Sequence, residues 1–165
     1  MLFVALLVLF TLVAALPHRL GLHVLPSWPA RMRVALSAAL LLIGLDHWLT
    51  PTRYLAMMPP YLPLHEPLVL FTGACEVAGA MGLLWPRTRG LAGIMLAIYF
   101  VCVFPANLHN ALHGLNTQGL PSAGWYYWAR LPFQPLIILW TLYAAELLRW
   151  PQPFRFRGAR SAALR

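Results

Sequence analysis

The sequence predicts an all-α protein, a polytopic membrane bundle of five helices in a single domain, 1–165. Its composition is the first observation, because 61% of the residues are hydrophobic and only 10% are charged, far from the balance of ordinary soluble domains. The second observation is a series of five apolar segments close to membrane-spanning length. The third is the position of the arginines, which gather in alternate loops.

The first expected helix covers residues 2–16. A short apolar start also fits a signal peptide, but no positive charge precedes this one, and Arg19, Arg31 and Arg33 follow it. We therefore expect an uncleaved transmembrane helix whose N-terminus lies outside.

Four further apolar segments complete the expected bundle. The second helix is again short, whereas the last three have the length that a bilayer requires. A basic tail, 151–165, follows the last helix and is expected to face lipid headgroups in the cytoplasm. The four expected transmembrane helices are 34–49, 67–85, 90–108 and 132–150.

Arginine counts predict how the bundle is oriented. Ten of the twelve arginines lie in the loop 17–33, in the loop 86–89 and from residue 149 onward, whereas the two opposite loops hold only Arg53 and Arg130. Because cytoplasmic loops are enriched in basic residues, we expect the N-terminus outside and the C-terminus inside. Leaving out the short first helix gives the same sidedness for the other four.

The net charge of +8 indicates lipid rather than nucleic acid as a partner. All the basic residues are arginines beside the ends of apolar segments, where topology and anionic headgroups account for them. We therefore expect membrane lipids as partners and no nucleic acid. The absence of lysine from a chain rich in alanine and leucine is typical of a GC-rich bacterial genome. Together with the five apolar segments, this composition predicts a multi-pass protein of the bacterial inner (cytoplasmic) membrane.

Glu76 lies deepest among the ionisable residues of the expected helices. It falls near the middle of 67–85, where an unpaired charge in lipid costs about 2.5–3.5 kcal/mol. The side chain must therefore face protein, and Gly73, Gly79 and Ala80 on the same flank allow a second helix to approach closely. Glu76 is a candidate proton carrier or headgroup ligand. A protonated glutamic acid that pins two helices together is the structural alternative.

Several histidines fall at the ends of helices that are expected to lie outside. His109 and His113 are four residues apart, so they share a face if the helix continues that far, and this spacing suits two imidazoles on one metal ion. His47 and His65 would complete a metal site. Interfacial hydrogen bonding and helix capping explain the same histidines, and contact with a quinone headgroup is a third alternative.

Pro105 is predicted to kink or end the helix 90–108, because proline lacks a backbone donor and clashes with the preceding turn. The carbonyls freed near residue 101 then need donors. Asn107 is a nearby amide that can supply them. It is therefore either a structural clip or a ligand.

Glu146 and the two cysteines are expected to have structural roles rather than catalytic ones. Glu146 precedes Arg149 by three residues, a helical spacing that favours a surface ion pair. Cys75 and Cys102 lie inside apolar segments and form no Cys-x-x-Cys pair, so we expect neither a disulfide scaffold nor a dithiol motif.

Four motifs in order resemble the DoxX family of small bacterial membrane proteins. They are GLDHW at 44–48, MMPPYLP at 57–63, TGACEVAGAMGLLWPRTR at 72–89 and FPANLHNAL at 104–112. The resemblance implies a four-helix core over about residues 34–150, to which this chain adds one N-terminal helix. The positions that match the family motifs are His47, Pro60, Gly73, Glu76, Pro86, Arg89, Pro105, Ala106 and Asn107, of which Gly73, Pro86, Arg89 and Pro105 are expected to be structural.

DoxX relatives are linked to thiosulfate oxidation with electrons passed to quinone, or to oxidative-stress and thiol homeostasis. The resemblance therefore implies a redox-associated, quinone-linked accessory subunit, with a small ligand held in the outer half of the bundle by Glu76, His47 and Asn107. No complete catalytic constellation is visible, so we expect at most a subunit of an oxidoreductase that works with a periplasmic or membrane redox partner. No haem or flavin is expected.

Two other functions remain as alternatives. One is a non-catalytic membrane assembly factor that binds a partner through its outer histidines and anionic lipid through its arginine tail. The other is a periplasm-facing metal-binding protein that uses His109, His113, His47 and His65.

Overall fold

A computed structural model describes residues 2–19, 24–25, 27–114 and 124–148. These parts of the chain form helices joined by turns and contain no β-strand, so the prediction of an all-α fold is confirmed. The helices are α1 (Leu2–Arg19), α2 (Trp28–Leu49), α3 (Pro51–Leu55), α4 (His65–Leu84), α5 (Arg89–His113) and α6 (Gly124–Ala144).

The helix α2 begins six residues before the predicted start at 34. Ser27 caps it, since its side chain accepts a hydrogen bond from the backbone N–H of Ala30, and Pro29 occupies the first turn. The prediction counted apolar residues only and therefore began after Arg31 and Arg33. The short helix α3 was not predicted.

The helix α5 runs through Pro105 and ends at His113, so the predicted end at 108 is wrong. Its C-cap is Gly114, whose φ of 58° is the left-handed conformation that terminates many helices. Pro105 leaves the carbonyl of Val101, four residues earlier, without its helical donor, and Gln134 of α6 supports the same turn by donating to the neighbouring carbonyl of Phe100.

The helix α6 begins eight residues before the predicted start at 132 and ends at Ala144 rather than 150. It stops because Glu146 adopts a φ of 62°, and the N–H groups of Leu147 and Leu148 then bond back to the carbonyl of Leu142. The predicted tail, 151–165, lies outside the described residues.

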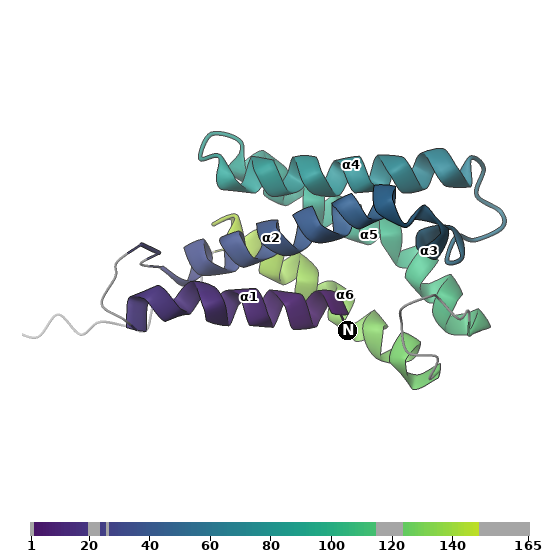
Figure 1. Cartoon of the computed structure of the whole chain (residues 1–165), viewed down its shortest axis with the longest axis horizontal. Coiled ribbons are helices and arrows are strands. Elements are labelled where there is room, and N and C mark those ends of the chain that lie inside the picture. Colours follow the sequence, from purple (N-terminus) through teal and green to yellow (C-terminus); the bar gives the residue numbers. More distant parts are fainter. Residues whose placement is uncertain (1, 20–23, 26, 115–123, 149–165) are drawn as a thin grey trace, which may run out of the picture.

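Four helices form a closed ring. α2 packs against α4, α4 against α5, α5 against α6, and α6 against α2. α1 lies along α2 on the side away from α4, as Figure 1 shows. The described chain is thus a four-helix bundle with α1 attached outside it.

The helices α2 and α4 cross at two glycines. A Cβ atom on Gly73 would lie 2.7 Å from the Cβ of His47 and 2.8 Å from the carbonyl oxygen of Gly44, and one on Gly44 would lie 2.9 Å from the carbonyl oxygen of Gly73. No side chain fits between the backbones here. The close approach that Gly73 predicted is therefore confirmed, with α2 as the partner.

The outer faces of the bundle are apolar. Large exposed side chains include Leu12 on α1, Leu42 on α2, Phe71 on α4 and Leu91 on α5, a surface suited to contact with lipid. Three helices of the described chain, α2, α4 and α5, are long and apolar enough to cross a membrane, and α1 contains a shorter apolar segment, Phe3–Pro17.

Glu146 ties three helices together at one end of the bundle. Its Oε1 accepts hydrogen bonds from Arg33 of α2 at 3.0 Å and from Arg89 of α5 at 3.1 Å. Arg33 also donates to the carbonyl of Ala144, the last residue of α6. The hydrogen bond from Arg33 and the charges of both arginines hold the pKa of Glu146 below its usual value. The expected partner, Arg149, lies outside the described residues.

Candidate functional site

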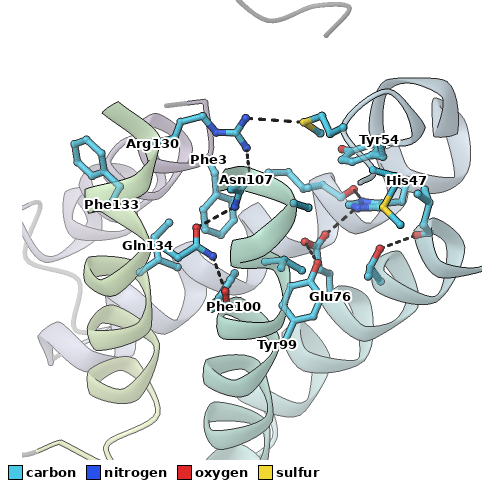
Figure 2. A pocket seen from close by; sticks show the side chains of 18 of the residues that line it. Phe3, His47, Tyr54, Glu76, Tyr99, Phe100, Asn107, Arg130, Phe133 and Gln134 are labelled. Atoms are coloured by element: carbon cyan, nitrogen blue, oxygen red, sulfur yellow. Dashed lines mark hydrogen bonds and ion pairs between the residues drawn. The ribbon is translucent and has the colours of Figure 1, made fainter. Parts of the chain in front are cut away.

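A cavity of about 220 Å³ lies inside the bundle toward the end where α3 packs. Most of its wall is apolar, including Phe3 of α1 and Phe100 of α5. Polar side chains from α2, α3, α4, α5 and α6 point into it, as Figure 2 shows. Together with Thr72, the polar residues that line the cavity are His47, Tyr54, Glu76, Tyr99, Asn107, Arg130 and Gln134.

Glu76 is buried in the wall of this cavity, with 6% of its surface exposed. Its Oε1 accepts a hydrogen bond of 2.7 Å from the hydroxyl of Tyr99. Its Oε2 lies 3.6 Å from Nδ1 of His47 and has no hydrogen-bond partner among the described residues. An unpaired buried oxygen is costly unless a ligand, water or proton completes it.

His47 is positioned by its own helix and by a neighbouring ring. Its Nδ1 lies 2.8 Å from the carbonyl of Ile43, so the N–H form of this atom donates there. Its ring stacks on Tyr54 of α3, with the centroids 3.6 Å apart and the planes inclined by 20°. The imidazole therefore has little freedom to turn away from Glu76.

Tyr54 is fixed by Asp46, the residue before His47. Asp46 Oδ2 accepts from the Tyr54 hydroxyl at 2.8 Å and from Arg53 at 2.6 Å, while Oδ1 accepts from Thr50 at 2.6 Å. Burial and the bond to Asp46 raise the pKa of Tyr54 far above its usual value. The phenol therefore stays a donor to Asp46, and this network closes the α3 end of the cavity.

A second chain of hydrogen bonds crosses from α5 to α6. Arg130 donates to Oδ1 of Asn107 at 3.0 Å, and Nδ2 of Asn107 donates to Oε1 of Gln134 at 3.1 Å. Nε2 of Gln134 then donates to the carbonyl of Phe100 at 2.6 Å, next to Val101, whose carbonyl Pro105 leaves without a helical donor. Asn107 does not form the predicted clip on a carbonyl of α5, since both polar atoms of its side chain bond to side chains of α6. Asn107 instead holds Gln134 and Arg130 in place.

Arg130 meets the cavity without a carboxylate counter-ion. The chain has four acidic side chains, all of which the structure describes. Asp46 pairs with Arg53, Glu146 pairs with Arg33 and Arg89, and none of the four forms an ion pair with Arg130. A partly buried guanidinium without an opposite charge favours an acceptor-rich ligand.

The four histidines proposed as metal ligands are not brought together. His109 and His113 do share a face of α5, with ring centroids 4.1 Å apart, and Nδ1 of His113 lies 2.9 Å from the carbonyl of His109. Nε2 of His65 lies 3.0 Å from the carbonyl of Pro59. Within the described ranges, no three His, Cys, Asp or Glu side chains form a group that could hold a metal ion.

The residues expected to be structural have the following positions. Gly73 lies at the α2 crossing, Pro86 lies in the turn between α4 and α5, Arg89 pairs with Glu146, and Pro105 lies within α5. The two cysteines are free thiols.

Sequence reasoning found three of the polar residues of the cavity and missed the others. Glu76, His47 and Asn107, the three ligand candidates, all line the cavity. Tyr99 and Gln134 were missed, although each is a polar group within an apolar segment. Arg130 could have been recognised as a candidate site residue, because it is one of only two arginines in the loops expected to lie outside.

Comparison with known proteins gives one match. The family described as "Domain of unknown function (DUF8561)" matches residues 36–145, from the first half of α2 to just beyond α6. No curated protein and no solved structure matches the chain. The matched region contains the four-helix ring except for the first turns of α2, and every polar residue of the cavity, whereas α1 precedes it.

Proposed function

We propose that this chain, which belongs to the DUF8561 family, is a redox-associated accessory subunit that binds a quinone-like headgroup in its internal cavity. Electrons come from a partner protein in or beside the membrane. The subunit binds the headgroup and exchanges protons with it, without a haem or flavin of its own.

The membrane placement is part of this proposal. Five spans, with the N-terminus outside and the C-terminus inside the bacterial inner membrane, place the cavity in the outer half of the bundle. The apolar faces of α2, α4 and α5 and the ten arginines beside alternate helix ends support this arrangement. The resemblance of four motifs to the DoxX family is consistent with it, and kinship with that family belongs to the same proposal.

The observation that carries the proposal is the convergence of Glu76, His47 and Asn107 on one largely apolar cavity. Small-ligand sites combine an apolar wall with a few placed polar groups. A quinone is a flat ring with carbonyl oxygens at opposite edges. The arrangement offers Arg130 and the Asn107 chain for one edge, and His47 with Glu76 for the other.

The chemistry of reduction fits the two sides of the cavity. Conversion of a quinone to its quinol takes up two electrons and two protons, one proton on each oxygen. Glu76 Oε2 has no hydrogen-bond partner in the described part of the chain and lies beside His47, so this pair can pass a proton to the near oxygen. The two electrons and the proton for the far oxygen are supplied by the redox partner.

The test is to purify the protein in mild detergent, extract small molecules and measure the quinone per protein by mass spectrometry. We expect bound quinone with the natural chain and a clear loss with Glu76→Gln. Glu66→Gln is the matched control, because Glu66 is an exposed glutamate in the first turn of the same helix. Absence of quinone from the natural chain, together with unchanged quinone-dependent respiration in cells carrying Glu76→Gln, would overturn the proposal.

A further inference from the structure

A second hollow, of about 660 Å³, lies between α1 and α6. Both helices pack against α2, and the hollow is the groove that they flank. Its walls are apolar and aromatic side chains such as Leu7, Met32, Leu136, Leu139 and Trp140. We call it the α1–α6 groove.

The groove adjoins the polar cavity. Val4 of α1 and Phe133 and Ile137 of α6 line both. Along α6 the groove extends from Phe133 to Tyr143, about 15 Å at 1.5 Å per residue. The two hollows together have a polar end at Glu76 and Arg130 and a long apolar end.

We infer that the ligand of the cavity is an amphiphile with a single long apolar chain, which lies in the α1–α6 groove while the headgroup occupies the cavity. This inference rests on the proposed function and extends it. A free headgroup would leave the groove empty, whereas a chain attached at the cavity wall continues directly past Phe133 and Ile137. The ligand enters sideways from the bilayer, between α1 and α6.

The polarity of the two ends fixes the direction of the ligand. Arg130, which has no carboxylate partner among the described residues, and the unpaired Oε2 of Glu76 both lie at the cavity end. The groove walls offer few polar groups. An acceptor-rich head therefore belongs at the cavity end, and a hydrocarbon chain belongs in the groove.

A chain that leaves lipid for the groove gains packing rather than hydrophobic free energy, because lipid is as apolar as leucine. The expected advantage of a chain is therefore modest. We expect a long-chain ligand to bind roughly tenfold more tightly than its short-chain analogue after correction for partition into detergent.

The test compares two probes, a substituted benzoquinone with a single isoprene unit and the same ring with a long polyisoprene chain. Binding is measured at constant detergent with the natural chain, with Leu136→Trp, and with Val101→Trp. Leu136 lines only the groove and is 56% exposed, so a larger side chain there fills the groove without disturbing the core. Val101 is 58% exposed on α5 and is the matched control.

We expect Leu136→Trp to weaken the long-chain probe roughly tenfold and to leave the short-chain probe unchanged, with Val101→Trp altering neither. Leu139→Trp, a second exposed groove position, should repeat the result. Equal affinity of the natural chain for both probes, with no effect of either groove variant, would overturn the inference and leave headgroup binding intact. Failure of both probes to bind the natural chain would instead overturn the proposed function, and the inference with it.

Discussion

Glu76 and His47 face each other across the crossing of α4 and α2, with Oε2 of the glutamate 3.6 Å from Nδ1 of the histidine. Gly73 lies one turn before Glu76 on α4, and Gly44 lies three residues before His47 on α2. Their backbones touch, so the two functional side chains are held at the closest point between the helices. The distance between Glu76 and His47 therefore depends on Gly73 and Gly44, because a side chain at either glycine would push the two helices apart.

Gly73→Ala should separate this pair. The new methyl group would lie 2.7 Å from the Cβ of His47 and 2.8 Å from the Gly44 carbonyl, contacts that require α2 and α4 to move apart. We expect a loss of about 1–3 kcal/mol in stability, typical of overpacking, and weaker quinone retention, measured by thermal unfolding in detergent and by extraction.

Gly90→Ala is the control for this change. A Cβ on Gly90 would meet only Leu147, at an ordinary 3.7 Å, and alanine favours a helix over glycine by about 1 kcal/mol. This variant should be as stable as the natural chain or more so. An equal loss of stability in Gly73→Ala and Gly90→Ala would contradict a specific requirement for glycine at the crossing of α2 and α4.

Gln134→Leu should destabilise the junction of α5 and α6. It removes the donor to the Phe100 carbonyl and the acceptor for Asn107, and an unsatisfied buried polar group costs about 1–3 kcal/mol. Thr141→Val, a buried change on the same helix, should cost less because the Thr141 hydroxyl bonds only within α6. Similar melting temperatures for the two variants would contradict the role given to Gln134.

Glu146 should stabilise the fold in a pH-dependent way. Its pKa is lowered by Arg33 and Arg89, so the ionised form favours the folded state. The contribution is complete above the usual pKa of 4.5 and is lost as the pH falls through the lower folded-state value. Because the carboxylate is exposed, we expect no more than about 1 kcal/mol, reduced further by salt.

The comparison of Glu146→Gln with the natural chain measures this contribution. The variant should melt at a lower temperature at neutral pH and low salt, and the difference should shrink in acid. A difference that stays constant from neutral pH to well below 4.5 would show that the carboxylate charge contributes nothing.

Arg130→Met should weaken headgroup binding without unfolding the bundle. Arg130 donates to Asn107 and meets the cavity without a carboxylate, so its charge is available to a ligand. A charged hydrogen bond is worth about 1.5–3 kcal/mol, roughly a ten- to hundredfold change in affinity for a benzoquinone probe. The affinity of Arg130→Lys should lie between those of the natural chain and Arg130→Met, because lysine keeps the charge but lacks the planar guanidinium group. Unchanged affinity in Arg130→Met would remove Arg130 from the site.

The helices and part of the site could be predicted because polar residues are rare in an apolar chain. Glu76, His47 and Asn107 stood out for this reason, and all three line one cavity. Tyr99 and Gln134 did not stand out, since each acquires its role only from a partner on another helix.

The helix ends were harder to predict, because local bonds rather than hydrophobicity decide them. Ser27 extends α2 beyond its apolar segment by capping, and the positive φ of Glu146 ends α6 before its apolar segment is complete. The helix α5 continues through Pro105 to His113, and a residue 29 positions after the proline, Gln134, bonds the Phe100 carbonyl in the turn before it. Such a long-range bond is not visible in a local pattern.

Photolabelling tests the central claim, that a quinone headgroup occupies the cavity, most directly. The purified protein is irradiated with a short-chain azido-benzoquinone, and labelled peptides are mapped by mass spectrometry. We expect label near Tyr54, Met57 and Asn107 that unlabelled quinone displaces and that Glu76→Gln reduces. Label spread over outward apolar residues such as Leu91 and Ile98, without displacement by unlabelled quinone, would contradict the account.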